Sequence, residues 1–126
     1  MIRQELEFFL DRGDSLGFQK ATGTDDYLGW ILLSKRKPNE RLLSLLQPNE
    51  EPQFVAEQET IRRRPYQVLV QDLRRDVYES NAYETNEDFR LNQCYRFASL
   101  DEVEDFVRQF GHTLTQIKWP VEIMPR

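Results

Sequence analysis

Residues 94–111, with the sequence CYRFASLDEVEDFVRQFG, decide the fold class of this chain. Ser99 stands where a helix N-cap should be and Glu102 follows three residues later, so each side chain can accept a hydrogen bond from the other's backbone N–H. Gly111 supplies the helix stop. Between these signals the apolar residues recur at helical spacing and form one stripe: Leu100, Val103, Phe106, Val107 and Phe110. The stretch predicts a strand that leads into a capped amphipathic helix.

Further strands are predicted on both sides of this stretch. A bounded apolar run and an alternating run precede it, at Tyr27–Ser34 and Tyr66–Leu73, and Leu91–Phe97 feeds directly into the helix. After Gly111, Leu114–Trp119 is a possible final strand, which Pro120 would place at the edge of a sheet.

The remaining segments are less uniform. Ile2–Leu10 fits a helical stripe and a strand alternation equally well, and the turn residues that follow it favour short strands. Arg41–Leu46 is a short helix or a strand, and its leucines favour the helix. Asp72–Phe89 is very polar and suits either a long loop or a surface helix.

Together these segments predict an α+β fold. We expect a single domain over residues 1–126, with about five short and mostly antiparallel strands packed against one or two helices. A strand–helix–strand unit forms its C-terminal part.

Composition narrows the class of function. The chain has 126 residues, 39% of them hydrophobic, and a formal net charge of −5. The negative charge argues against a nucleic-acid partner, because phosphates would be repelled. No apolar run is long enough for a membrane span, and the N-terminus lacks the apolar core of a signal peptide. We therefore expect a cytoplasmic protein with no membrane partner.

Catalytic and metal chemistry find little support. Cys94 and His112 are the only cysteine and the only histidine, so neither a disulfide within the chain nor a cysteine- or histidine-rich metal site is expected. The two residues flank the predicted helix and could form a nucleophile and base pair, but we favour structural roles for both. No nucleotide-binding motif is present. The sequence predicts a protein that is not an enzyme and that uses no cofactor and no metal.

Two basic clusters offer an alternative as an anion-binding site. One is Arg62, Arg63 and Arg64, and the other is Lys35, Arg36 and Lys37. Guanidinium groups bind phosphate and carboxylate in bidentate fashion, so together the clusters could bind a small anionic ligand. The simpler interpretation is that they are charged strand ends that discourage edge pairing.

The acidic segment before the helix is the preferred partner-binding site. Its candidate contact residues are Asp76, Tyr78, Glu79, Tyr83, Glu84, Glu87 and Asp88. Tyrosines among carboxylates can anchor a basic protein, and acidic surfaces speed association with such partners. We therefore expect a protein-binding module, in its narrower form an inhibitor or immunity-type protein that blocks a basic partner. A structural homodimer joined through an exposed strand is the other class kept open.

Overall fold

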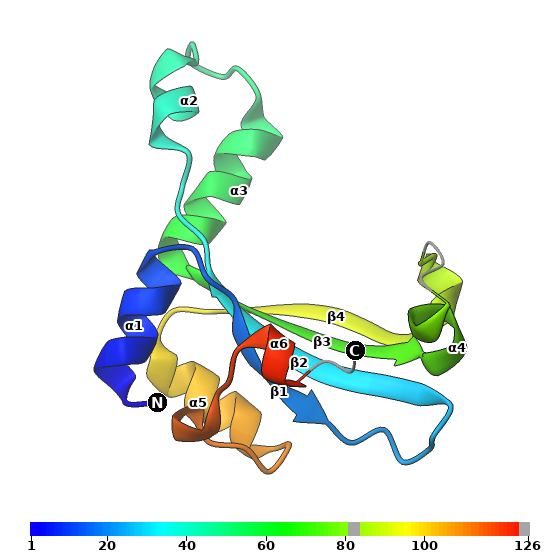
Figure 1. Cartoon of the computed structure of the whole chain (residues 1–126). Coiled ribbons are helices and arrows are strands. Elements are labelled where there is room, and N and C mark those ends of the chain that lie inside the picture. The colour runs from blue at the N-terminus through cyan, green and yellow to red at the C-terminus, as the bar shows by residue number, and fades with distance from the viewer. Residues whose placement is uncertain (81–83, 124–126) are drawn as a thin grey trace.

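The fold is built around a four-stranded antiparallel sheet. A computed structural model describes residues 1–80 and 84–123. Its sheet is a meander in chain order, β1-β2-β3-β4 (Figure 1). The strands are β1 (Leu16–Lys20), β2 (Tyr27–Lys35), β3 (Tyr66–Arg74) and β4 (Phe89–Phe97). Among the described residues, β4 pairs only with β3 and forms one border of the sheet.

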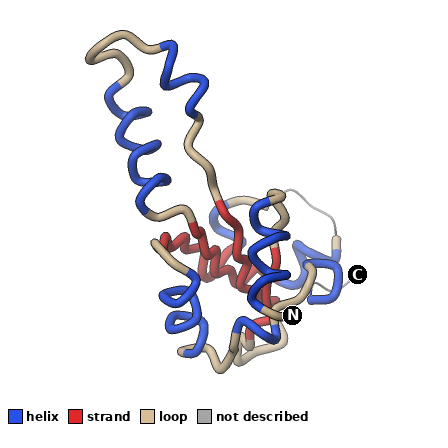
Figure 2. The backbone as a smooth tube through the Cα atoms, turned by 90° about the vertical axis from the view of Figure 1, so that its left-hand side faces the viewer, coloured by secondary structure: helices blue, strands red, loops and turns tan. Residues whose placement is uncertain are grey.

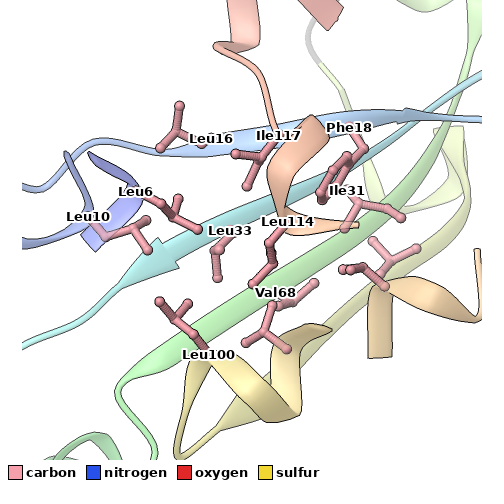
Figure 3. Close-up of a cluster of buried hydrophobic side chains, with 13 residues drawn as sticks. Leu6, Leu10, Leu16, Phe18, Ile31, Leu33, Val68, Leu100, Leu114 and Ile117 are labelled. Atoms are coloured by element: carbon pink, nitrogen blue, oxygen red, sulfur yellow. The ribbon is translucent and has the colours of Figure 1, made fainter. Parts of the chain in front are cut away.

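One face of the sheet carries the main core. Two helices, α1 (Arg3–Asp11) and α5 (Leu100–Arg108), pack on this face together with the 3-10 turn η2 (Leu114–Gln116). Figure 3 shows side chains from α1, α5 and the η2 region gathered over the strands. The buried residues are Leu6, Leu10, Leu16, Phe18, Ile31, Leu33, Val68, Val70, Leu100, Val103, Val107, Leu114 and Ile117. We call this side the helix-covered face.

The described residues cover the opposite face at one end only. The short helices α4 (Arg75–Glu79) and α6 (Pro120–Ile123) lie there, and Ile123 packs into a second, smaller cluster. That cluster consists of Leu28, Trp30, Leu73 and Ile123. Towards β4 this face remains open, and Asn92 and Cys94 are exposed.

A helical hairpin projects from the sheet between β2 and β3. It consists of α2 (Glu40–Leu45) and α3 (Pro52–Arg63), and both views show it standing away from the rest of the molecule (Figures 1 and 2). We call residues 36–65 the arm. Its two chain segments meet where they leave the sheet, since the Arg36 amide donates to the Pro65 carbonyl at 2.8 Å.

The α+β class expected from the sequence is confirmed, and several segments are now settled. The N-terminal segment that fitted two patterns is helix α1 (Arg3–Asp11), and the leucine-rich segment is helix α2. The strands predicted at Tyr27–Ser34, Tyr66–Leu73 and Leu91–Phe97 are β2, β3 and β4. The final strand predicted at Leu114–Trp119 is wrong: it is a 3-10 turn followed by one β-bridge between Lys118 and Gly17. No helix in the described parts of the chain has both the length and the apolar character that crossing a membrane requires.

The capped helix that decides the fold also gives a stability prediction. The Ser99 hydroxyl accepts from the Glu102 amide at 3.3 Å, and the Glu102 carboxylate accepts from the Ala98 amide at 2.8 Å. Ser99→Ala is expected to lower the free energy of unfolding by about 1 kcal/mol, because one helix-end amide loses its partner. Urea denaturation measures the effect. Ser44→Ala, an exposed position inside α2, is the control, and an equal loss in both variants would contradict the capping role.

Candidate functional site

The arm exposes apolar side chains at its free end. Asn39 caps α2 by accepting from the Leu42 amide at 3.1 Å, and Pro52 starts α3 at a position that needs no amide donor. The connection between the helices holds Asn49 and Glu51 in left-handed backbone conformations, with φ of 65° and 49°. The turn reverses the direction of the chain, so that α3 runs back towards the sheet.

The arm is held together near its base, not at its tip. Ile61 is buried, and the buried Gln58 side chain accepts from the Asn39 amide at 2.6 Å. Arg62 bridges the two helices by pairing with Glu40 at 2.6 Å and with Glu59 on its own helix. These contacts tie α3 to the start of α2, so the tip is carried on an ordered base.

The tip itself is largely uncovered. Leu45 is 68% exposed, Leu42 47% and Val55 36%. Beside them lies a shallow hollow between the two helices, lined by Leu43, Leu46, Gln47, Pro48, Asn49, Glu50, Pro52, Val55 and Ala56. Exposed carboxylates lie in the connection between the helices, at Glu50, which lines the hollow, and at the neighbouring Glu51. We call this combination of apolar centre and acidic border the arm tip.

The two basic clusters predicted from the sequence meet at the base of the arm. Their chain segments are adjacent through the bond between Arg36 and Pro65. Lys35 pairs with Asp11 at 2.6 Å, and Lys37 donates to the Asp11 carbonyl at 3.1 Å, so these two lysines fasten the arm base to α1. The hydrogen bond from Lys35 lowers the pKa of Asp11, and the same bond raises the pKa of Lys35.

Half of the six basic residues are therefore committed to contacts within the chain. Arg62 is engaged with glutamates, as described. Arg36, Arg63 and Arg64 are exposed and form no ion pair with any described residue. These three arginines are the part of the predicted anion site that remains available.

The acidic segment is partly neutralised by its own neighbours. Arg74 pairs with Asp76 at 2.6 Å and with Asp88 at 3.6 Å, while Arg75 pairs with Glu79 at 3.6 Å. Exposed carboxylates with no described ion pair remain at Glu84 and at Glu87, which is the middle residue of the 3-10 turn η1 (Asn86–Asp88). We call Asp76, Glu79, Glu84, Glu87 and Asp88 the acidic corner.

The two tyrosines predicted for this site differ in how they can be placed. Tyr78 is half-buried and packs beside the smaller cluster, with its ring centroid 6.1 Å from that of Trp30. Tyr83 lies outside the described residues. Because much of the Tyr78 ring is turned to the cluster, only part of it is open to a partner.

Arg74 lowers the pKa of Asp76 in the acidic corner, which yields a second prediction. Its hydrogen bond is the main cause that holds the pKa of Asp76 below the ordinary value of 3.8. The stabilisation from this ion pair is complete above the ordinary pKa of an aspartate, and it is lost as the pH falls through the lower pKa that Asp76 has in the folded protein. Arg74→Gln is expected to raise the pKa of Asp76, as read from carboxyl NMR shifts between about pH 2 and pH 6. The pKa of Asp11, which Lys35 controls, is the reference that should not move; an unchanged pKa at Asp76 would contradict the pairing.

The predicted residues at the ends of α5 are far apart in the fold. His112 stacks on Phe18 of β1, with ring centroids 4.7 Å apart. Cys94 lies on β4, with β2 and β3 between it and β1, and on the opposite face. Cys94 and His112 are therefore too far apart to act as a nucleophile and its base. The Cys94 side chain is exposed.

A buried charged cluster escaped the sequence interpretation. Asp72 is 2% exposed, and its two carboxylate oxygens are taken by Lys20 at 2.7 Å and by Arg90 at 2.8 Å. Arg90 also donates to the Thr22 carbonyl at 2.7 Å and lies over the Tyr27 ring at 4.5 Å. Both oxygens are occupied by cations of the chain itself, so this cluster fastens β1, β3 and β4 together and does not offer a free carboxylate.

No group of histidine, cysteine or carboxylate side chains within residues 1–80 and 84–123 has the arrangement of a metal site. Comparison of the chain with protein-family models, with curated protein sequences and with solved structures found no match. The candidate surfaces therefore rest on the geometry of the chain: the arm tip, the arm base and the acidic corner.

Proposed function

We propose that this chain is a non-enzymatic protein-binding module that holds a basic protein partner at its arm tip. The main observation behind this proposal is that the arm holds exposed leucines away from the body of the molecule, where no described part of the chain covers them. Exposed apolar groups of this kind, bordered by polar ones, are typical of protein interaction sites.

Charge indicates the kind of partner. The chain carries a net charge of −5, and Glu50 and Glu51 lie in the connection beside the apolar centre of the arm tip. An apolar anchor within an acidic border matches a partner cleft that is apolar inside and basic at its rim. We propose that the acidic corner acts at longer range, steering such a partner during encounter and giving association its salt dependence.

The narrower form of this proposal is an inhibitor or immunity-type protein. A projecting arm can enter the concave site of a basic enzyme such as a nuclease and exclude its substrate. A cytoplasmic setting fits a chain whose single cysteine is exposed and has no disulfide partner within the chain.

The test is capture with matched variants followed by reconstitution. The full chain, immobilised by one end, is exposed to lysate of the source cells beside the variant Leu42→Ser/Leu45→Ser. A protein retained by the wild type and lost with the variant is then identified, purified and titrated by calorimetry. Saturable binding at a fixed stoichiometry supports the proposal. Equal retention of every captured protein by both forms contradicts it.

The arm base supports a second candidate function, the binding of a small anion. The observation in its favour is that the fold brings Arg63 and Arg64 close to Arg36, all three exposed and without a described ion pair. Inorganic phosphate is the probe. Chemical-shift changes confined to these residues, and absent from Arg63→Gln/Arg64→Gln, would favour anion binding over the protein-binding role of the arm tip.

A further inference from the structure

The free border of β4 is an unprotected strand edge. From Leu91 to Tyr95 it contains neither a charged residue nor a proline, which are the usual devices that block edge pairing. The one irregularity in its pairing with β3 lies beyond Leu91, between the pairs Asp72–Leu91 and Leu73–Phe89. The stretch from Leu91 to Phe97, in which Arg96 is the one charged residue, pairs regularly with β3, and no described strand pairs with its outer side.

The direction of its backbone groups follows from the register of the whole sheet. At the other border, Gly17 exchanges both backbone hydrogen bonds with Lys118, at 2.8 and 2.9 Å, so its amide and carbonyl point away from β2. Along an antiparallel strand, the amide and carbonyl of successive residues point alternately to one side of the strand and to the other. Gly17 faces Leu32, Leu32 faces Leu69, and Leu69 faces Cys94.

It follows that the amide and carbonyl of Cys94 point outward from the sheet. Asn92 and Arg96, two residues to either side, point the same way. The bond from the Arg36 amide to the Pro65 carbonyl is an independent check. Arg36 lies four residues after Leu32 and Pro65 four residues before Leu69, so the alternation predicts that these two residues also point at each other between β2 and β3. Three outward-pointing residues thus offer three donors and three acceptors along the free edge.

We propose that this edge pairs with the β4 edge of a second copy of the chain, antiparallel and about a two-fold axis through Cys94. Cys94 is the midpoint of the regular stretch, so this register uses all three outward residues, with two hydrogen bonds for each facing pair. The two sheets join into one continuous sheet. This contact lies on the sheet and is independent of the role proposed for the arm.

The side chains are compatible in that register. Asn92 faces the second copy's Arg96 on one side of the sheet, and on the other Gln93 faces its Tyr95 and Leu91 its Phe97. Polar residues meet polar ones and apolar residues meet apolar ones, as in stable cross-strand pairs. An axis through Gln93 would instead place Arg90 opposite Arg96. The like charges disfavour that register.

The distances make Cys94 a reporter of the contact. Directly facing residues that exchange hydrogen bonds have Cα atoms about 5.5 Å apart, within the roughly 4.4–6.8 Å that a disulfide spans, and Cβ atoms roughly 5–5.5 Å apart, so a shift of about 1 Å between the two strands brings the thiols into bonding range. Asn92 residues of the two copies would be offset by four residues along the strand, about 13 Å. A cysteine at position 94 should form a disulfide between copies, and one at position 92 should not.

The experiment compares three forms of the full chain by sedimentation and light scattering. We expect a doubled mass for the wild type and for Cys94→Ser at roughly 500 µM, above the micromolar dissociation constant expected of a small interface. Cys94→Lys should remain a monomer, because it sets two lysines opposite each other. The residue is exposed, so neither variant should disturb the fold, which circular dichroism verifies.

The second arm of the experiment uses diamide as the oxidant. The wild type should form a dimer linked through Cys94, whereas Cys94→Ser/Asn92→Cys should react at least about tenfold more slowly, because its thiols are out of disulfide range. A wild type that stays monomeric at this concentration, a dimer that persists in Cys94→Lys, or equal cross-linking at both positions would each overturn the proposal.

Discussion

Replacing Asp72 with asparagine is expected to lower the free energy of unfolding by about 3–5 kcal/mol, the range observed when one partner of a buried ion pair is removed. The Lys20 side chain is 12% exposed and loses its carboxylate partner at 2.7 Å. Arg90 loses its partner at 2.8 Å at the same time. Because the cluster joins three strands, its loss should appear as a cooperative loss of stability in urea denaturation.

An exposed pair provides the control for this result. Arg3 and Asp101 are 3.0 Å apart with side chains 44% and 87% exposed, so Asp101→Asn should cost less than about 1 kcal/mol. The comparison separates burial from charge, since both substitutions remove one carboxylate. A loss at Asp72 no larger than the loss at Asp101 would show that the buried cluster does not hold the strands together.

The second large effect is expected in partner binding. Leu42→Ser/Leu45→Ser should weaken binding at least about 100-fold, because two anchor residues at an interface centre each contribute on the order of 2 kcal/mol. The free energy of unfolding should change little, since both side chains are exposed in the free chain. Calorimetric titration of the purified partner measures the first quantity, and urea denaturation measures the second.

A matched pair of apolar residues exists elsewhere on the surface. Ile2 and Phe8, beside and on α1, are 60% and 61% exposed, comparable to the two leucines. Ile2→Ser/Phe8→Ser should leave the affinity unchanged. If both double variants weaken binding equally, general surface hydrophobicity and not the arm tip would account for the interaction.

The parts of the fold that the sequence predicts are those where one physical signal dominates. The capping pair and the apolar stripe of α5 act within a single segment, so local chemistry sufficed. The strand prediction at Leu114–Trp119 was wrong because no single signal dominates there. Its backbone pairs with β1 at Lys118 alone, and its buried residues Leu114 and Ile117 fit a turn over the core as well as they fit a strand.

The arm was missed because its helices bury little. In α3 only Gln58 and Ile61 are buried, so no strong apolar stripe marks it as a helix. Pro52 followed by twelve residues without glycine was the available signal, as a proline at a helix start is favourable. That the arm projects depends on tertiary placement and is not encoded in any local pattern.

In the candidate site, too, contacts between sequence neighbours could be predicted, whereas features that depend on the tertiary fold could not. The arginines that neutralise the acidic corner, Arg74 and Arg75, were visible beside it in the sequence, and their pairing could have been anticipated. Asp72 also carried a signal, since it continues the alternation of the buried residues Val68 and Val70. The exposure of Cys94 was beyond reach, because it depends on which strand ends the sheet.

The most direct test of the proposed function is to ask which part of the chain the partner touches. A photoreactive amino acid is placed singly at Leu45 on the arm tip, at Glu84 on the acidic corner and at Ile2 beside α1, and each full-length chain is irradiated with the purified partner. We expect efficient cross-linking from position 45, and little from positions 84 and 2. Cross-linking from position 84 or 2 with none from position 45 would contradict the assignment of the arm tip as the binding surface.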